Sequence, residues 1–236
     1  MEVNIKQALK MFFSNSSFEM IYFEAFANAL DAEATEFNID ISMSNESDWK
    51  NMAVTISDNG VGFNDVRFGK FSKLFDVEEQ SHKGLGRLVY LCYFDEVCIE
   101  SVFENTKKRT FIFNDTFDKD CRLSDVKQTS NGTIIKLRCF NGERLGKKDY
   151  INPHYIKKSL LENFYMKFYK AKLAGKSINV NIESNISGGM MKDCISTSEL
   201  PNFCIKEIDS KIDLFNKIEL FYNVRAVSPS ESNVIT

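Results

Sequence analysis

The chain has 236 residues, of which 43% are hydrophobic and 13% aromatic, so it can bury a sizeable core and is not disordered by composition. Its formal net charge of −3 gives the whole chain no electrostatic basis for binding nucleic acid, although a local basic patch remains open. The six cysteines include no Cys-x-x-Cys pair, which argues against a zinc site. No apolar run approaches the length needed to span a membrane, so we expect a cytoplasmic protein without a membrane segment.

The first strong pattern predicts an amphipathic helix over residues 16–33, opened by a Ser-x-x-Glu capping box at Ser16. On a helix of 3.6 residues per turn, Glu24, Asn28 and Asp31 project from one side, and apolar residues cover the other. An acid and an amide one turn apart either bind a ligand or belong to an ordinary solvated face.

Two strands are expected next, over residues 37–41 and 52–57, because apolar and polar residues alternate there. The second strand ends at Asp58, and Gly60 and Gly62 follow it. A carboxylate at the end of a buried strand is costly unless a hydrogen-bond donor meets it, and the two glycines leave room for a ligand. The arrangement suits a planar donor such as the amino group of a purine, although Asp-Asn-Gly is also common turn chemistry.

Residues 64–82 are mixed and charged, with phenylalanines that suit either a packed helix or a closing segment. They are followed by the basic glycine motif Lys83-Gly84-Leu85-Gly86-Arg87. This motif leads into a continuous apolar run that predicts a buried helix over residues 88–94. Backbone amides at a glycine-rich helix start bind anions, and the basic neighbours add positive charge.

The second half of the chain predicts further strands and one long helix. Strands are expected over residues 97–102, 109–113, 131–137, 178–182 and 218–227. The third of these contains Gly132-Thr133, which is either part of a ligand pocket or a common hairpin turn. The helix expected over residues 153–172 is rich in lysine, which is typical of a solvated face but also compatible with phosphate contacts.

The acid–amide helix, the Asp-x-Gly-x-Gly turn and the basic Gly-x-Gly occur in a specific order. This set resembles the GHKL ATPases, a family that includes the gyrase B subunit, heat-shock chaperones of the ninety-kilodalton class, sensor histidine kinases, and MutL with its MORC relatives. The resemblance covers about residues 15–140. It implies an α+β fold, a two-layer α/β sandwich of the Bergerat type in which helices cover one face of a mixed sheet.

The resemblance also implies roles for single residues. The position matching Glu24 is the general base that activates the attacking water, and Asn28 matches a residue that helps to hold Mg²⁺. Asp58 matches the residue that binds adenine, and Thr133 lies near the adenine in the family. The remaining nucleotide-binding positions implied are Asp31, Gly60, Gly62, Lys83, Gly84, Leu85, Gly86 and Arg87.

A carboxylate at Glu24 favours the hydrolysing branch, with MutL, MORC and the heat-shock chaperones, over the histidine kinases. The resemblance therefore implies Mg²⁺-dependent binding and slow hydrolysis of ATP. It also implies that residues 64–82 close over the nucleotide as a lid and that closure leads to homodimerisation. The whole protein would then be a larger clamp-like protein with a protein or DNA client. The alternative is an ATP-binding switch or scaffold module, in which ATP is only a structural ligand or switch and is not significantly hydrolysed.

Two parts are expected: an ATP-binding domain over residues 1–145 and a smaller α+β segment over 146–236. The strand at 218–227 resembles the one that opens the transducer domain of MutL-like and gyrase-like proteins. Their transducer supplies a lysine to the γ-phosphate, for which no residue is assigned here, so we expect weak hydrolysis by this chain alone.

Overall fold

The computed structural model describes residue 9, residues 16–72, 86–117, 119–141 and 145–200, and the backbone of 204–208 and 218–222. By compactness the chain divides into two units, Met1–Ser198 and Glu199–Thr236.

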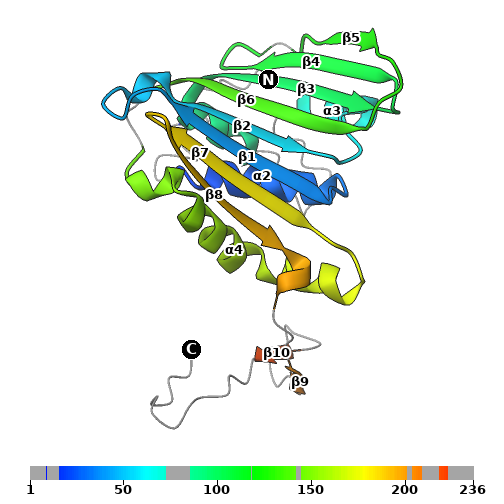
Figure 1. Cartoon of the computed structure of the whole chain (residues 1–236). Helices are drawn as coiled ribbons and strands as arrows, with labels where there is room; N and C mark the ends of the chain where they lie inside the picture. The colour runs from blue at the N-terminus through cyan, green and yellow to red at the C-terminus, as the bar shows by residue number, and fades with distance from the viewer. Residues whose placement is uncertain are drawn as a thin grey trace. The chain divides into compact units, whose positions relative to one another are not determined.

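The first unit is built on an eight-stranded sheet with the strand order β5-β4-β3-β6-β2-β1-β7-β8 (Figure 1). The strands are β1 (Glu36–Met43), β2 (Ala53–Asp58), β3 (Phe94–Phe103), β4 (Lys107–Phe113), β5 (Arg122–Asp125), β6 (Gly132–Phe140), β7 (Asn179–Ile186) and β8 (Gly189–Ser196). Neighbouring strands are antiparallel except β1 and β7, which are parallel. The expected mixed sheet is therefore confirmed.

Helices cover one face of this sheet. The described helices are α2 (Met20–Asp31), α3 (Asp65–Ser72) and α4 (Pro153–Leu173), with short 3₁₀ turns η1 (Trp49–Asn51), η2 (Gly86–Cys92), η3 (Lys148–Ile151) and η4 (Thr197–Glu199). The ring of Phe26 in α2 contacts Phe37 of β1 and Phe168 of α4, each with ring centroids 5.1 Å apart. Such aromatic packing joins α2 and α4 to the same side of the sheet, which confirms the α+β two-layer sandwich.

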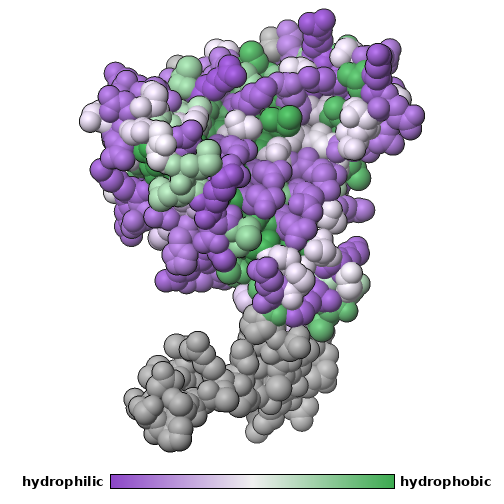
Figure 2. All heavy atoms as spheres, viewed as in Figure 1, coloured by the Kyte–Doolittle hydropathy of each residue, from purple (hydrophilic) through white to green (hydrophobic). Residues whose placement is uncertain are grey.

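Alternation along the strands explains which face is covered. In β1, Phe37, Ile39 and Ile41 are buried and Asp40 between them is exposed. On the outer side of β3, Glu100 accepts hydrogen bonds from Lys108 at 2.6 Å and from Lys136 at 2.5 Å. These bonds lower the pKa of Glu100 to about 2. Figure 2 shows the molecule from the same side as Figure 1, and most of the coloured residues on this face are hydrophilic.

The predicted capping box at the start of α2 is wrong. The helix begins at Met20, and Glu19 precedes it without a side-chain cap. The Glu19 carboxylate instead accepts hydrogen bonds from Tyr155 Oη at 3.0 Å and Ser159 Oγ at 2.7 Å, both in α4. A tertiary contact with α4 has therefore replaced the local cap.

The sheet continues past residue 145, because β7 pairs with β1 and β8 pairs with β7. The separation by compactness falls instead after Ser198. In the second unit, β9 (Cys204–Ile208) pairs antiparallel with β10 (Ile218–Tyr222). A functional division into an ATP-binding domain and a transducer-like segment stays a prediction. In the described part of the chain, no helix is both long and apolar enough to cross a membrane.

Candidate functional site

Helix α2 presents polar side chains to a large cavity. Glu24, Asn28 and Asp31 line this cavity, while the opposite side of the helix is buried in the core. Asn28 Nδ2 donates a hydrogen bond to Glu24 Oε1 at 3.0 Å. Because the amide nitrogen faces Glu24, the amide oxygen is the Asn28 atom left to coordinate a cation or accept another hydrogen bond.

Asp58 closes strand β2 and lies opposite Thr133 of β6 in the sheet register. The backbone amide of Gly60 donates to Asp58 Oδ1 at 2.8 Å, which fixes the orientation of the carboxylate. Burial raises the pKa of Asp58 above its ordinary value, and the Gly60 hydrogen bond and the positive charge of Arg67 oppose this rise. The site therefore holds an oriented, largely buried acceptor at the end of the strand.

The two glycines after Asp58 are required by close contacts. A Cβ on Gly60 would lie 2.7 Å from both the Cβ and the carbonyl oxygen of Ala32. Gly62 has a φ of +74°, and a Cβ there would lie 2.2 Å from the carbonyl oxygen of Val102. Gly62 lines the cavity, whereas Gly60 lets the turn pack against the end of α2.

Two residues that hold this turn were not identified from the sequence. Asn59 Oδ1 accepts hydrogen bonds from the backbone amides of Thr35 at 2.8 Å and Glu36 at 2.9 Å. Ser101 Oγ, which is buried, accepts from the Phe63 amide at 2.9 Å and lies 3.0 Å from Thr133 Oγ1. Ser101 is a polar residue on the otherwise apolar inward side of strand β3, and this break in the pattern is the signal that could have revealed it.

The end of the basic glycine motif faces α2. A Cβ on Gly86 would lie only 2.0 Å from Glu24 Oε2, so glycine allows the carboxylate to approach the backbone. Arg87 is buried, and its guanidinium lies over the ring of Phe71 in α3 at 4.7 Å from the centroid. Burial lowers the pKa of Arg87 to about 10, against the opposing influence of Glu24.

The rest of this motif, Lys83, Gly84 and Leu85, lies outside the described residues. The predicted helix over residues 88–94 is wrong in type and extent. The chain forms the 3₁₀ turn η2, which ends at Cys92, and Phe94 begins β3. The run is buried as expected, and burial rather than helical periodicity explains its continuous apolarity.

These segments enclose one cavity of about 1180 Å³, large enough for a nucleotide-sized ligand. The lining residues that the sequence predicted are Glu24, Asn28, Asp31, Asp58, Gly62, Gly86, Arg87 and Thr133. Helix α4 adds Phe164 and Lys167, which the sequence did not indicate. The apolar wall includes Ile99 and Ile135 from the sheet.

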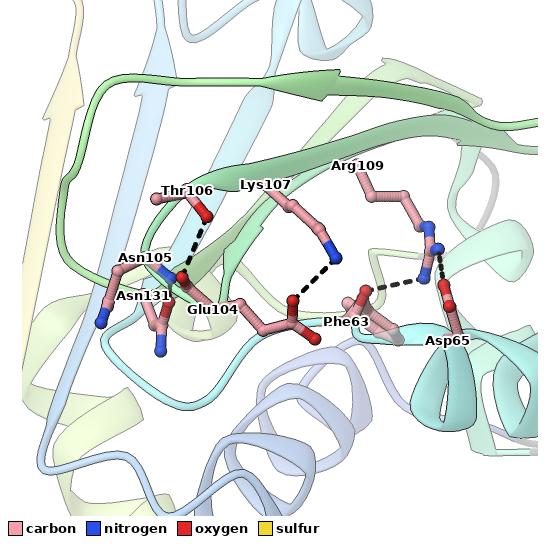
Figure 3. Close-up of polar contacts among 8 residues, drawn as sticks. All are labelled: Phe63, Asp65, Glu104, Asn105, Thr106, Lys107, Arg109 and Asn131. Carbon is pink, nitrogen blue, oxygen red and sulfur yellow. Dashed lines mark hydrogen bonds and ion pairs between the residues drawn. The ribbon is translucent and has the colours of Figure 1, made fainter.

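Helix α3, the described start of the expected lid, is fixed to the sheet by a buried arginine. Arg109 of β4 donates to the carbonyl oxygen of Phe63 at 2.8 Å and pairs with Asp65 at the beginning of α3 (Figure 3). Its guanidinium also lies 4.5 Å from the ring centroid of Phe68. Phe68 in turn contacts Phe111 of β4 at 5.0 Å. The phenylalanines of this helix therefore pack on the sheet in the described conformation.

No protein-family model matches this chain, and no curated protein matches it. Among solved structures, it is similar to the ATP-binding domain of topoisomerase IV from Francisella tularensis in complex with a small-molecule inhibitor. The two are 15% identical with a TM-score of 0.50, over 80% of this chain and 92% of that one. The N-terminal domain of a DNA repair protein is 14% identical with a TM-score of 0.46, over 82% of this chain and 55% of the other. The chain thus has the α+β fold of the topoisomerase IV ATP-binding domain, as the sequence motifs predicted.

Proposed function

We propose that the chain binds ATP in the cavity, with Mg²⁺, and hydrolyses it slowly. The observation that carries this proposal is the convergence of three segments, separated in sequence, on one cavity: Glu24 and Asn28 from α2, Asp58 at the end of β2, and Gly86 before β3. The shared fold with an ATP-binding domain supports it.

The adenine is placed at Asp58, whose oriented carboxylate accepts a hydrogen bond from the exocyclic amino group. Thr133 lies beside Asp58 in the sheet and supplies a hydroxyl at the same end. The phosphates then extend toward Glu24, Asn28 and the glycine motif that ends at Gly86 and Arg87. Lys83, Gly84 and Leu85 keep their proposed phosphate-binding roles from the sequence motif.

Hydrolysis is assigned to Glu24. Its carboxylate accepts a proton from a water molecule as the water oxygen bonds to the terminal phosphorus, and the bond to the bridging oxygen breaks to give ADP and phosphate. The donor set suits a nucleotide-bound magnesium ion, because the Asn28 amide oxygen is a neutral ligand and the phosphates provide the charge. Bound Mg²⁺ would neutralise charge on the phosphates.

The proposed consequence of binding is conformational. The segment over residues 64–82, which starts with α3 beside the cavity, closes over the triphosphate and promotes homodimerisation. The carboxylate at Glu24 supports a place in the hydrolysing branch with MutL, MORC and the heat-shock chaperones. A protein or DNA client belongs to the same proposal.

The second candidate function is an ATP-dependent switch without significant hydrolysis. The exposed surroundings of Asn28 favour it, because a site open to solvent provides less electrostatic stabilisation of a transition state than an enclosed one. Phosphate release measured beside nucleotide affinity separates the two functions.

Glu24→Gln tests the assignment of the base. The glutamine keeps the side-chain shape but cannot accept the proton, so we expect ATP affinity within about threefold of wild type and at least a ~100-fold loss of phosphate release. Glu33→Gln, just beyond the end of α2, is the matched control and should retain both properties. Unchanged turnover in Glu24→Gln would remove Glu24 as the base, and a wild-type protein that binds no nucleotide at millimolar concentration would refute the proposal.

A further inference from the structure

Lys167 of α4 lines the cavity, although the lysines of this helix were expected to form a solvated face. Its side chain is exposed, and Phe164, one turn earlier, lines the cavity as well. A four-carbon side chain with a mobile ammonium group is suited to reach an anion from the edge of a cavity. The part of a ligand that Lys167 can reach depends on which residues of the neighbouring helix α2 lie at the same level as Lys167.

Helices α2 and α4 lie side by side and run in the same direction. Glu19 of the turn before α2 accepts hydrogen bonds from Tyr155 at 3.0 Å and Ser159 at 2.7 Å, one turn apart on α4. The ring of Phe23 lies 6.0 Å from that of Phe164, and the ring of Phe26 lies between Phe164 at 5.0 Å and Phe168 at 5.1 Å, measured between centroids. Because both helices rise by about 1.5 Å per residue, the sequence offset between partners stays nearly constant. Lys167 therefore falls at a level between Glu24 and Asn28, where the phosphates are proposed to bind.

The charges around Lys167 point to an anion as its partner. Lys157 and Lys158 of the same helix pair with Asp193 at 2.8 Å and Glu162 at 3.7 Å. Among the described residues, Lys167 makes no ion pair. The arginines at the cavity are already engaged, since Arg67 donates to the Asp31 carbonyl at 2.7 Å and the Arg87 guanidinium lies over Phe71.

We propose that Lys167 contacts the phosphate chain of the nucleotide, an inference that rests on the proposed function. The lysine belongs to a helix that covers the eight-stranded sheet, so it is distinct from the transducer-like strands at the end of the chain. Its ammonium group donates a charge-assisted hydrogen bond to a phosphate oxygen. The bond is made with phosphate and not with the base or ribose, so its strength depends on the number of phosphates in the ligand.

The test compares Lys167→Ala with Lys170→Ala in the full chain, by calorimetric titration with ATP and with adenosine. Lys170 is exposed on the same helix and does not belong to the cavity lining, so both variants lose the same charge. For Lys167→Ala we expect the Kd for ATP to rise about 5- to 20-fold at low salt, less at high salt, with adenosine affinity unchanged. Lys170→Ala should stay within about twofold of wild type, and Lys167→Arg should recover most of the affinity.

Several outcomes would overturn the inference while leaving the proposed function intact. An unchanged ATP affinity in Lys167→Ala would mean that the lysine is merely solvated. Equal losses in the two alanine variants would indicate a general charge effect, and an equal loss for adenosine would exclude the phosphates as the contact. If the wild-type protein binds neither ligand, the proposed function itself fails, which is a distinct result.

Discussion

At the scale of single residues, the site contains side chains that hydrogen bonds from backbone amides hold in one orientation. Asp58 is oriented by the Gly60 amide, and the turn that carries both is held by Asn59 through the amides of Thr35 and Glu36. Preorganised acceptors of this kind bind a ligand without the cost of ordering at the time of binding. Loss of the oriented Asp58 carboxylate should therefore weaken ligand binding.

Asp58→Asn should weaken ATP binding by about 10- to 100-fold, because a charge-assisted hydrogen bond contributes roughly 1.5–3 kcal/mol. Asp40→Asn, on the outer face of the sheet, is the control and should bind like wild type. Isothermal titration with ATP measures both. An Asp58→Asn variant that binds normally would show that adenine does not contact this carboxylate.

The raised pKa of Asp58 also predicts how binding depends on pH. If adenine binds the ionised carboxylate as proposed, affinity should fall as the pH drops through the raised pKa, because burial makes protonation of Asp58 easier than that of an ordinary aspartate. The stability of the protein without ligand should depend on pH in the opposite direction. The folded state binds the Asp58 proton more tightly than the unfolded state, so protonation stabilises the fold, and this stabilisation is lost as the pH rises through the raised pKa. The decline in affinity should begin at a higher pH than for an ordinary aspartate and should disappear in Asp58→Asn.

The sequence was sufficient to place together residues that are close in the chain. Glu24 and Asn28 are four residues apart, and Gly60 and Gly62 lie two and four residues after Asp58, so helical and turn geometry already brings them together. Ser101 lies beside Thr133, and Lys167 lines the cavity, from a strand and a helix that are distant in sequence from Glu24 and Asp58. Only the packing of the folded chain brings these two residues to their places.

At the scale of elements, α3 is held at the cavity by contacts with the sheet and has no buried residue of its own. Arg109 supplies the polar contact at its beginning, and the rings of Phe68 and Phe71 lie against Phe111 at 5.0 and 5.3 Å. A short helix with this few anchors can separate from the sheet more easily than a core helix. This property suits the first element of a lid.

Arg109→Met should loosen α3 while leaving the sheet intact. The methionine fills part of the buried space but cannot donate to the Phe63 carbonyl or pair with Asp65, so we expect a loss of about 1–3 kcal/mol and faster hydrogen exchange over residues 63–72. Lys107→Met, on the same strand, removes the exposed ion pair with Glu104 and should cost less than about 1 kcal/mol (Figure 3). Equal exchange rates in the two variants would contradict the anchoring role of Arg109.

Elements were predictable where a regular pattern determined them. The alternation over residues 37–41 identified β1, and Pro153 marked the start of α4, where Asn152 Oδ1 accepts from the His154 amide at 2.9 Å. The run after Arg87 was misassigned as an α-helix, because continuous apolarity reports burial and not the type of turn. The capping box predicted for α2 was wrong, because the Glu19 carboxylate accepts a hydrogen bond from Ser159 of α4, more than one hundred residues later.

At the scale of the whole molecule, the parallel pairing of β1 with β7 joins the segment after residue 145 to the sheet that carries Asp58. No local pattern predicts this pairing. Parallel strands are joined by a long connection, and buried and exposed residues alternate along β1 and β7 as they do in antiparallel strands. Since α4 precedes β7 and contributes Lys167 to the cavity, the later segment also takes part in the proposed site.

The last prediction concerns assembly. If closure of the segment that begins with α3 promotes homodimerisation, a non-hydrolysable ATP analogue with Mg²⁺ should shift the protein toward twice the monomer mass of 27.1 kDa, and ADP should do so less. Val66 of α3 lines the cavity and is 68% exposed, so α3 presents an apolar side chain that a second copy can cover. Size-exclusion chromatography with light scattering measures the mass, and the Asp58→Asn control should need about 10- to 100-fold more analogue for the same shift. If the analogue binds by calorimetry but the mass stays at one copy, nucleotide binding and dimerisation are not coupled in this chain.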